Sequence, residues 1–399
     1  MTQPFSGVRI VDFTQVLAGP FAVMQLALLG AEVIKVEQPG TGDQTRGLMN
    51  DDNDDGMSPA FMTCNVNKKS LTLDLKAPAA RPVVERLVQS ADVVVENFRA
   101  GTMDRLGFGY AALSKIKPDL VYCAVSGYGQ RGPKAGLAAY DGAIQAASGM
   151  MSQTGHPETG PTRTGYMPVD MCTALNTAFA IAAALYRKRV TGEGQLVDVA
   201  MLDTAIVAQA AQFSGYLNAG KLVGLNGNAS PTGQPTADVF PTRDGHIQIT
   251  ALRQHQVEAL FAVIDEAGEL SRPEFADSKS RLANAAAVKA CVREALARDT
   301  TGNWRRRLEQ AGVPVAEVRS LPEVVADEQL ATRGVLETLP SPLGDDREIH
   351  VVKAGFVTDR DGPAIHAGPP RLGAHTREVL QALGYDDGAI DALRSQNVI

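Results

Sequence analysis

The sequence predicts an α/β fold built around a parallel sheet with helices on both sides. Short runs rich in Val and Ile alternate with longer runs of helical periodicity through the first half of the chain. This alternation is typical of a parallel sheet whose strands are joined by helical crossovers. The chain has 399 residues, of which 44% are apolar, and this is enough for a large buried core and about two domains.

The predicted strands and helices follow one another in order. The first strand is followed by a Gly19–Pro20 pair that is expected to break the chain, and Gly30 is expected to end the first helix. The predicted strands are 8–13, 32–36, 92–96, 120–125 and 195–199, and the helices between and after them are 21–29, 77–90, 109–116, 171–186 and 200–217.

The helix predicted at 171–186 differs from the others because its apolar residues cover every side. This pattern predicts a helix that is buried on all its faces. Three basic residues at 187–189 complement the helix dipole at its end, and Gly192 is expected to stop it.

The second half of the chain begins with a change in composition. Residues 220–234 are rich in Gly, Asn, Ser, Pro and Thr, which indicates a linker. Residues 238–242 and 246–249 flank a short polar turn and predict a hairpin. Helical patterns then fill 254–311, and two short helices are expected within 376–393.

Composition excludes several classes of protein. The formal net charge of -7 argues against nucleic acid and anionic membranes as partners. The four cysteines, Cys64, Cys123, Cys172 and Cys291, lie far apart, so neither a disulfide framework nor a zinc site is expected. The apolar run at 178–185 is shorter than the ~20 residues of a membrane span. We therefore expect a soluble cytoplasmic protein that binds neither a membrane nor nucleic acid.

Common cofactor and metal motifs are missing. The turn Leu17–Pro20 lacks the GxGxxG pattern, so an NAD or FAD site is not expected, although the sheet is Rossmann-like in outline. The acidic run 51–56 matches the first half of a calcium loop, but its twelfth position is Met62 rather than a bidentate Glu. The six histidines are scattered. No metal site is predicted.

Asp170 is the most informative carboxylate because it comes immediately before the apolar helix. One interpretation is a helix N-cap, in which its oxygens accept free backbone N–H groups. The other is a nucleophile: a carboxylate at a helix start is kept ionised by the dipole, yet it can face a dry pocket. Spacing alone leaves both interpretations open.

A set of motifs that spans essentially the whole chain resembles the class III coenzyme A (CoA) transferase family, which includes formyl-CoA transferase, carnitine CoA-transferase and α-methylacyl-CoA racemase. The motifs that carry the resemblance are GVRIVDFT at 7–14 with AGP at 18–20, LGAEVIKVE at 29–37, GD at 42–43, NKKS at 67–70, LDLK at 73–76, DVVVENFR at 92–99, SGYGQ at 126–130, TGEGQ at 191–195 and AGVP at 311–314.

The resemblance implies a Rossmann-like large domain, a smaller α+β domain and an interlocked homodimer. Applied to this chain, it places residues 1–218 and 330–399 in a discontinuous large domain that binds CoA. Residues 219–235 would form the linker, and residues 236–329 the small domain.

The resemblance also implies a mechanism with Asp170 as the nucleophile. Asp170 would attack an acyl-CoA thioester to form an anhydride, then an aspartyl-CoA thioester, and a carboxylic acid acceptor would receive the CoA. The partners are then an acyl-CoA and a small carboxylic acid, and no tightly bound cofactor is expected.

Other site residues follow from matching positions. Tyr140, Asp141, Gln15 and Gly233 are expected to orient the substrate or to stabilise the oxyanion. The residues expected to bind CoA are Val16, Leu17, Ala18, Leu73, Asn97, Phe98, Arg105, Leu106 and Met201.

Two departures from the family pattern bear on the reaction. Leu17 stands where formyl-CoA transferase has a glutamine, which argues against oxalate and indicates a more apolar pocket, for a C4 or C5 mono- or dicarboxylate. Tyr140–Asp141 stands where the racemase has a His–Asp pair, and a phenol with a pKa near ~10 is a poor base. Transfer is favoured over two alternatives: intramolecular CoA transfer within a dicarboxylic acyl-CoA, and α-methylacyl-CoA racemisation or isomerisation.

Overall fold

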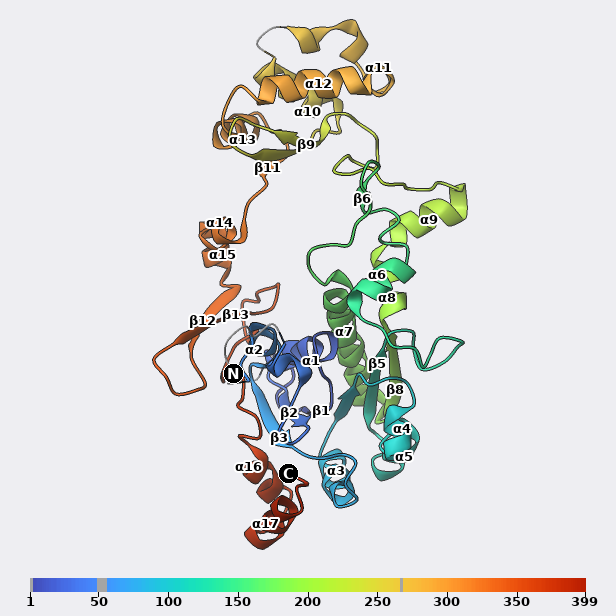
Figure 1. Ribbon diagram of the computed structural model, residues 1–399, viewed down its shortest axis with the longest axis vertical. Coiled ribbons are helices and arrows are strands. Elements are labelled where there is room, and N and C mark those ends of the chain that lie inside the picture. The colour runs from blue at the N-terminus through green and yellow to red at the C-terminus, as the bar shows by residue number, and fades with distance from the viewer. Residues whose placement is uncertain (1–2, 49–55, 266–267) are drawn as a thin grey trace. The chain divides into compact units, whose positions relative to one another are not determined.

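The computed structural model describes residues 3–48, 56–265 and 268–399. Its main sheet has six parallel strands in the order β3-β2-β1-β4-β5-β8 (Figure 1). The strands are β1 (Arg9–Asp12), β2 (Glu32–Glu37), β3 (Lys68–Thr72), β4 (Val93–Glu96), β5 (Val121–Ser126) and β8 (Gln195–Ala200). The predicted α/β fold with a large parallel sheet is therefore confirmed. In this doubly wound order, the chain reverses its direction of winding between β1 and β4.

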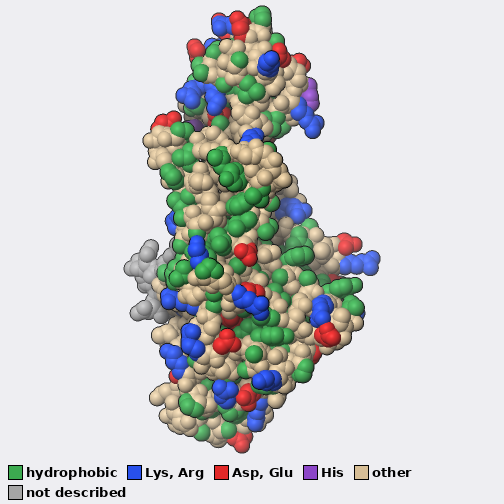
Figure 2. Space-filling view, turned by 90° about the vertical axis from the view of Figure 1, so that its right-hand side faces the viewer, with side chains coloured by type: hydrophobic (Ala, Val, Ile, Leu, Met, Phe, Trp, Pro, Cys, Tyr) green, Lys and Arg blue, Asp and Glu red, His purple; other side chains and the backbone are tan. Residues whose placement is uncertain are grey.

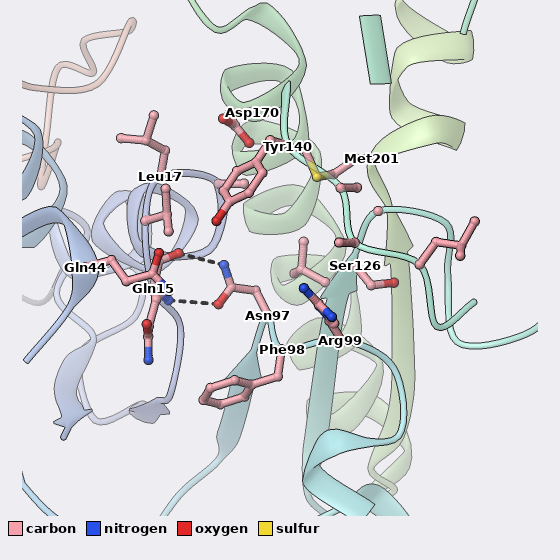
Figure 3. A pocket seen from close by; sticks show the side chains of 17 residues that line it. Gln15, Leu17, Gln44, Asn97, Phe98, Arg99, Ser126, Tyr140, Asp170 and Met201 are labelled. Carbon is pink, nitrogen blue, oxygen red and sulfur yellow. Dashed lines mark hydrogen bonds between the residues drawn. The ribbon is translucent and has the colours of Figure 1, made fainter. Parts of the chain in front are cut away.

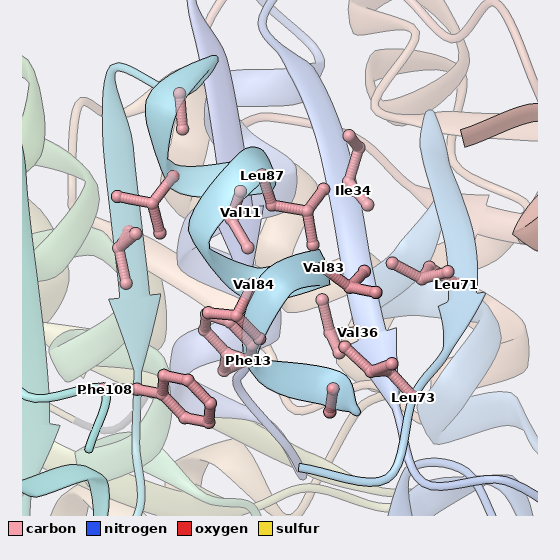
Figure 4. Close-up of a cluster of buried hydrophobic side chains, with 14 of the residues drawn as sticks. Val11, Phe13, Ile34, Val36, Leu71, Leu73, Val83, Val84, Leu87 and Phe108 are labelled. Atoms are coloured by element: carbon pink, nitrogen blue, oxygen red, sulfur yellow. The ribbon is translucent and has the colours of Figure 1, made fainter. Parts of the chain in front are cut away.

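Helices cover both faces of this sheet because alternate strand residues point to opposite sides. Ile10 belongs to the core under α1 (Ala18–Ala27) and α7 (Pro168–Thr191). The next residue, Val11, belongs to the core under α3 (Ala80–Gln89) on the other face (Figure 4). The helices α5 (Tyr110–Ile116), α16 (Thr376–Ala382) and α17 (Asp387–Ser395) complete that second face.

The C-terminal segment returns to the edge of the sheet. The backbone N–H of Asp74 donates to the carbonyl of Val398, and that of Thr72 donates to Thr376 Oγ1. The shorter elements of this unit are η1 (Gln44–Arg46), α2 (Pro59–Asn65), α4 (Thr102–Leu106), α6 (Asp141–Ala147), α8 (Met201–Ala208), α15 (Glu328–Arg333) and the hairpin β12 (Leu336–Pro340) with β13 (Glu348–Val352).

The chain divides into two compact units. The first contains Met1–Ser148, Thr164–Phe213 and Glu328–Ile399, and the second contains Gly149–Arg163 and Ser214–Asp327. The predicted domain boundaries at 219, 236 and 330 stay predictions.

The second unit has its own core around Trp304 and Phe240. An antiparallel sheet in the order β11-β10-β9 lies beside helices in this unit. The strands of the second unit are β6 (Gly155–His156), β7 (Gly160–Pro161), β9 (Ala237–Pro241), β10 (His246–Thr250) and β11 (Val315–Glu317). Its helices are α10 (Gln254–Ile264), η2 (Glu269–Ser271), η3 (Pro273–Phe275), α11 (Ser278–Ala283), α12 (Ala285–Leu296), α13 (Thr301–Gln310) and α14 (Leu321–Val325). Helix α9 (Ala210–Ala219) begins in the first unit and ends in the second.

The structure differs from the sequence prediction at the start of α1 and at β3. Gly19 and Pro20 do not break the chain; they form part of the first turn of α1, where a helix does not need the N–H that proline lacks. Glycine is needed there because a Cβ at position 19 would lie 2.5 Å from the Cβ of Thr14. The strand β3 was not predicted, since its Lys68 and Ser70 are polar, but both are buried.

The long helix α7 is also different from its prediction. It is not buried on every face, because the side chains of Phe179 and Tyr186 are 73% and 72% exposed. Among the described residues, α7 is the helix that is long and apolar enough to cross a membrane by length and composition, a property that core helices of soluble proteins share. The helix predicted at 200–217 is divided into α8 and α9. Positions 51–55 of the acidic run lie outside the described residues.

Candidate active site

A pocket with a volume of about 290 Å³ lies where the carboxyl ends of β1, β4, β5 and β8 meet (Figure 3). This is the point at which the sheet changes its winding direction, where doubly wound folds bind their ligands. The pocket is lined by Gln15, Val16, Leu17, Ala18, Gln44, Asn97, Phe98, Arg99, Val125, Ser126, Gly127, Leu137, Ala138, Ala139, Tyr140, Asp170 and Met201.

Asp170 is the only carboxylate among these lining residues. It is the third residue of α7, which begins at Pro168, and so it is not the N-cap of the helix. The N-cap position is Met167, whose side chain makes no capping hydrogen bond. The interpretation of Asp170 as an N-cap is therefore wrong, and its side chain is left free to face the pocket.

The start of α7 is instead capped by Asp141 from helix α6. One oxygen of Asp141, Oδ2, accepts hydrogen bonds from the backbone N–H groups of Val169 at 2.8 Å and Asp170 at 3.1 Å. The other oxygen accepts a hydrogen bond from the side-chain amide of Gln145. A buried carboxylate from one helix thus fixes the first turn of another, and with it the position of Asp170.

Burial raises the pKa of Asp170 to about 7, and the nearby negative charge of Asp141 acts in the same direction. The helix dipole, considered from the sequence alone, favours the ionised form, whereas burial acts in the opposite direction. Near neutral pH, both the protonated and the ionised forms of Asp170 are populated. The ionised form is poorly hydrated and therefore more nucleophilic than a carboxylate in water.

The loops after β1 and β4 are joined across the pocket by Asn97. Its side-chain Oδ1 accepts the backbone N–H of Gln15 at 2.8 Å, and its Nδ2 donates to the carbonyl of Gln15 at 2.7 Å (Figure 3). Both peptide groups of one residue are therefore held by one amide, which fixes the distance between the two loops.

Most of the residues predicted for the site come together here. Gln15, Val16, Leu17, Ala18, Asn97, Phe98, Tyr140, Asp170 and Met201 line the pocket, and Asp141 lies behind Asp170.

Besides Asp141, four predicted residues do not line this pocket. Leu73 is 1% exposed and packs in the core beneath α3 (Figure 4), and Leu106 packs against the same core. Arg105 is exposed and donates to Thr102 Oγ1 at 2.9 Å. Gly233 belongs to the second unit, where its N–H donates to the carbonyl of Ser230. The roles assigned to these four residues stay predictions.

Several known proteins are similar to this chain. The model for CoA-transferase family III matches residues 5–376. A succinate–glutarate CoA-transferase of Agrobacterium fabrum is 34% identical over 390 residues, which cover 95% of this chain and 96% of that protein. An acetyl-CoA:oxalate CoA-transferase of Acetobacter aceti is 38% identical over 334 residues, which cover 84% of this chain and 85% of that protein. The chain belongs to CoA-transferase family III.

A solved structure agrees with this assignment. The crystal structure of a CAIB/BAIF family protein from Brucella suis matches with a TM-score of 0.86 at 32% identity, covering 96% of this chain and 100% of that one. As a member of CoA-transferase family III, the protein is an acyl-CoA:carboxylate CoA-transferase.

Sequence reasoning missed three polar residues of the CoA-transferase pocket. The side chain of Arg99 is exposed, and its guanidinium has no hydrogen-bond or ion-pair partner within the described ranges; Gln44 likewise presents a free side-chain amide there. Ser126 places a buried hydroxyl, also without a described partner, at the end of β5. Arg99 and Ser126 could have been found from their positions, because they occur at or just after the carboxyl ends of predicted strands.

Proposed function

We propose that this enzyme moves CoA from an acyl-CoA donor to a carboxylate acceptor through covalent intermediates on Asp170. The observation that carries the proposal is the position of Asp170: among the described residues that line the pocket it is the single carboxylate, and its pKa is close to neutral. A nucleophile in that position can be ionised at physiological pH and still be poorly hydrated.

The proposed reaction has two matched halves. An oxygen of Asp170 attacks the thioester carbonyl, the C–S bond breaks, and CoA thiolate leaves an acyl-aspartyl anhydride. The thiolate then attacks the aspartyl carbonyl, which releases the donor acid as a carboxylate and leaves an aspartyl-CoA thioester. The acceptor carboxylate repeats these steps in reverse order and regenerates Asp170. No net proton is consumed, and thioesters of similar energy are exchanged.

The pocket also offers groups that could stabilise the oxyanions of these steps. The backbone N–H groups of Leu17 and Ala18 are at the start of α1 and have no hydrogen-bond partner among the described residues. Such fixed donors stabilise negative charge on a carbonyl oxygen. Tyr140 extends its ring at the pocket mouth and is proposed to orient the substrate.

The acceptor is proposed to be a C4 or C5 dicarboxylate. Leu17 makes the pocket wall apolar, and Arg99 and Gln44 supply polar groups around it. The name of the Agrobacterium relative contains succinate and glutarate, acids of this size. The free guanidinium of Arg99 suits either a second carboxylate or a CoA phosphate.

We further propose that the enzyme works in the cytoplasm as an interlocked homodimer, apart from membranes and nucleic acid. The homodimer is supported by a row of exposed apolar side chains on α7, formed by Leu175, Phe179, Tyr186 and Val190 and called here the α7 stripe. Their spacing places all four on one face of the helix. A face of this kind is typical of a protein interface. Hydrophobic side chains also gather among charged ones on the face in Figure 2.

The direct test is to detect the intermediate. The enzyme is incubated with succinyl-CoA, treated with hydroxylamine, and digested for mass spectrometry. We expect a hydroxamate on Asp170, CoA transfer to glutarate, and neither in Asp170→Asn. Asp203→Asn, which changes an exposed carboxylate in the first turn of α8, is the matched control and should keep both.

Two results would contradict the proposal. One is normal CoA transfer by Asp170→Asn. The other is uptake of deuterium at the α-carbon of a 2-methylacyl-CoA in heavy water with no acid present, which would favour racemisation.

A further inference from the structure

We infer that the buried ion pair of Lys35 and Asp43 is a positioning device, which holds a strained Val16 and thereby sets the backbone that faces the pocket. The inference rests on the proposed function in one respect, namely that this backbone serves CoA transfer. The positioning of Val16 by the ion pair does not depend on it. Neither Lys35 nor Asp43 lines the pocket.

The strain is at Val16. Its φ of 71° lies in the left-handed region, which a β-branched side chain strongly disfavours. The other non-glycine residues with positive φ in the described ranges are Asn67, Asp361 and Asn397, types that tolerate this conformation. Val16 is thus the exception, and it lies in the pocket wall.

The polar backbone groups from the carbonyl of Thr14 to the N–H of Val16 are all hydrogen-bonded to side chains of the protein. The carbonyl of Thr14 accepts Lys35 Nζ at 2.7 Å, and the N–H of Val16 donates to Asp43 Oδ1 at 3.1 Å. Between them, both peptide groups of Gln15 are bonded to Asn97.

The arrangement changes immediately after Val16. The N–H groups of Leu17 and Ala18 have no partner in the described part of the chain, and both residues line the pocket. The backbone groups before the left-handed turn at Val16 are therefore hydrogen-bonded within the protein, whereas the N–H groups after it face the pocket. A relaxed Val16 would rotate the following peptide and move these donors.

The ion pair that holds the turn is fully buried. Lys35 Nζ lies 2.8 Å from Asp43 Oδ2, and both side chains are 0% exposed. The oxygen of Asp43 that accepts Val16 also accepts the N–H and hydroxyl of Thr45, so its direction is fixed. Burial by itself would raise the pKa of Asp43, but Lys35 and these hydrogen bonds lower it below its usual range.

The charge of Lys35 is also maintained. Burial would lower its pKa, but the carboxylates of Asp43, Asp12 and Glu37 raise it overall. Two charges that remain ionised inside the protein are strongly coupled, and removal of Asp43 takes away the carboxylate in direct ion-pair contact with Lys35. The pair can therefore resist the relaxation of Val16.

Two substitutions test this inference without any substrate. Val16→Gly removes the strain, because glycine adopts this φ freely, and should raise Tm by about 2 °C. Asp43→Asn should speed hydrogen exchange of the segment 13–18 by about tenfold or more, measured by mass spectrometry. In the double variant Asp43→Asn/Val16→Gly, the increase in the exchange rate of this segment should be much smaller, because glycine at position 16 is not strained.

The kinetic arm uses CoA transfer at a temperature well below each Tm. Asp43→Asn should lower kcat about tenfold to a hundredfold, and the double variant should recover part of it. The control is Lys188→Met, which removes ion pairs to Asp92 and Asp119 at the opposite, amino-end edge of the sheet. It should lower Tm but leave kcat and exchange at 13–18 unchanged.

The outcomes separate this inference from the proposed function. A lower Tm in Val16→Gly, or unchanged exchange at 13–18 in a folded Asp43→Asn, would overturn the positioning role. If these measurements behave as expected but the wild-type enzyme transfers no CoA, the proposed function fails and the positioning role stands.

Discussion

The carboxylate of Asp170 is subject to two opposing influences. The positive end of α7 favours its ionised form, while burial and the charge of Asp141 favour its protonated form. Of burial and the charge of Asp141, burial has the larger effect, and together they raise the pKa to about 7. A small change in the surroundings of this one residue would therefore change the fraction of active enzyme at neutral pH.

This pKa predicts the dependence of activity on pH. We expect kcat/KM to rise with pH and to level off above about 7, since only ionised Asp170 attacks. Asp141→Asn keeps an oxygen for the start of α7 but removes a negative charge, so the midpoint should move to lower pH. A midpoint that stays at the wild-type value in Asp141→Asn would contradict the assignment to Asp170.

The same shift predicts the dependence of stability on pH. An acid whose pKa is raised on folding binds its proton more tightly in the folded state. Its stabilising effect is fully present below about 4, the ordinary pKa of Asp, and is lost as pH rises through 7. The Tm of the wild type should therefore fall relative to that of Asp170→Asn between pH 5 and pH 8. If the difference in Tm between the wild type and Asp170→Asn were equal at pH 5 and pH 8, the pKa of Asp170 would lie outside this range.

Among the elements, α7 depends on a neighbour for its first turn. Its own N-cap position offers no side-chain acceptor, and Asp141 of α6 replaces it with two hydrogen bonds. The helix that carries the proposed nucleophile is thus joined to the helix that begins beside the pocket mouth. Stability and positioning of Asp170 are coupled through one carboxylate.

Asp141→Ala should therefore affect both properties. Loss of the cap is expected to destabilise the fold by about 1–2 kcal/mol and to lower kcat as Asp170 moves. The matched control is Asp386→Ala, because Asp386 caps α17 through the N–H of Ala389. Thermal unfolding should show a similar loss for the control, with kcat unchanged. Equal kcat in both variants would argue against the coupling.

At the scale of the whole molecule, the α7 stripe is a feature that the fold of one chain leaves unexplained. Four large apolar side chains on one helix face are exposed, although the opposite face of α7 packs against the sheet and α1. The proposed homodimer would cover them. The stability of such an enzyme would then depend on its concentration.

Phe179→Asp tests this at the centre of the α7 stripe. A charge in a covered apolar interface should convert the dimer into monomers and lower Tm, as measured by light scattering after gel filtration. Gln89→Asp adds the same charge to the exposed surface of α3 and should have no effect. A wild-type protein that is already monomeric would refute the proposed dimer.

Much of the larger unit was predictable because its signals are local. Three consecutive Val residues at 93–95 place side chains on both faces of the sheet, and Gly30 follows the first helix as expected. Polar β3 was missed because its lysine and serine are buried by partners from distant segments. Lys68, for example, pairs with Asp12 at 2.9 Å. No pattern within β3 itself contains that information.

By itself, the sequence determined the parallel α/β architecture, the family resemblance and the choice of Asp170, since each depends on residues at fixed positions along the chain. Only the tertiary structure decided how Asp170 titrates, which residue caps α7, and why Val16 adopts a strained conformation. Burial, the charge of Asp141 and the pair of Lys35 with Asp43 all arise when separate segments meet. Hydration and electrostatic energy depend on those distances in space, which the order of residues does not state.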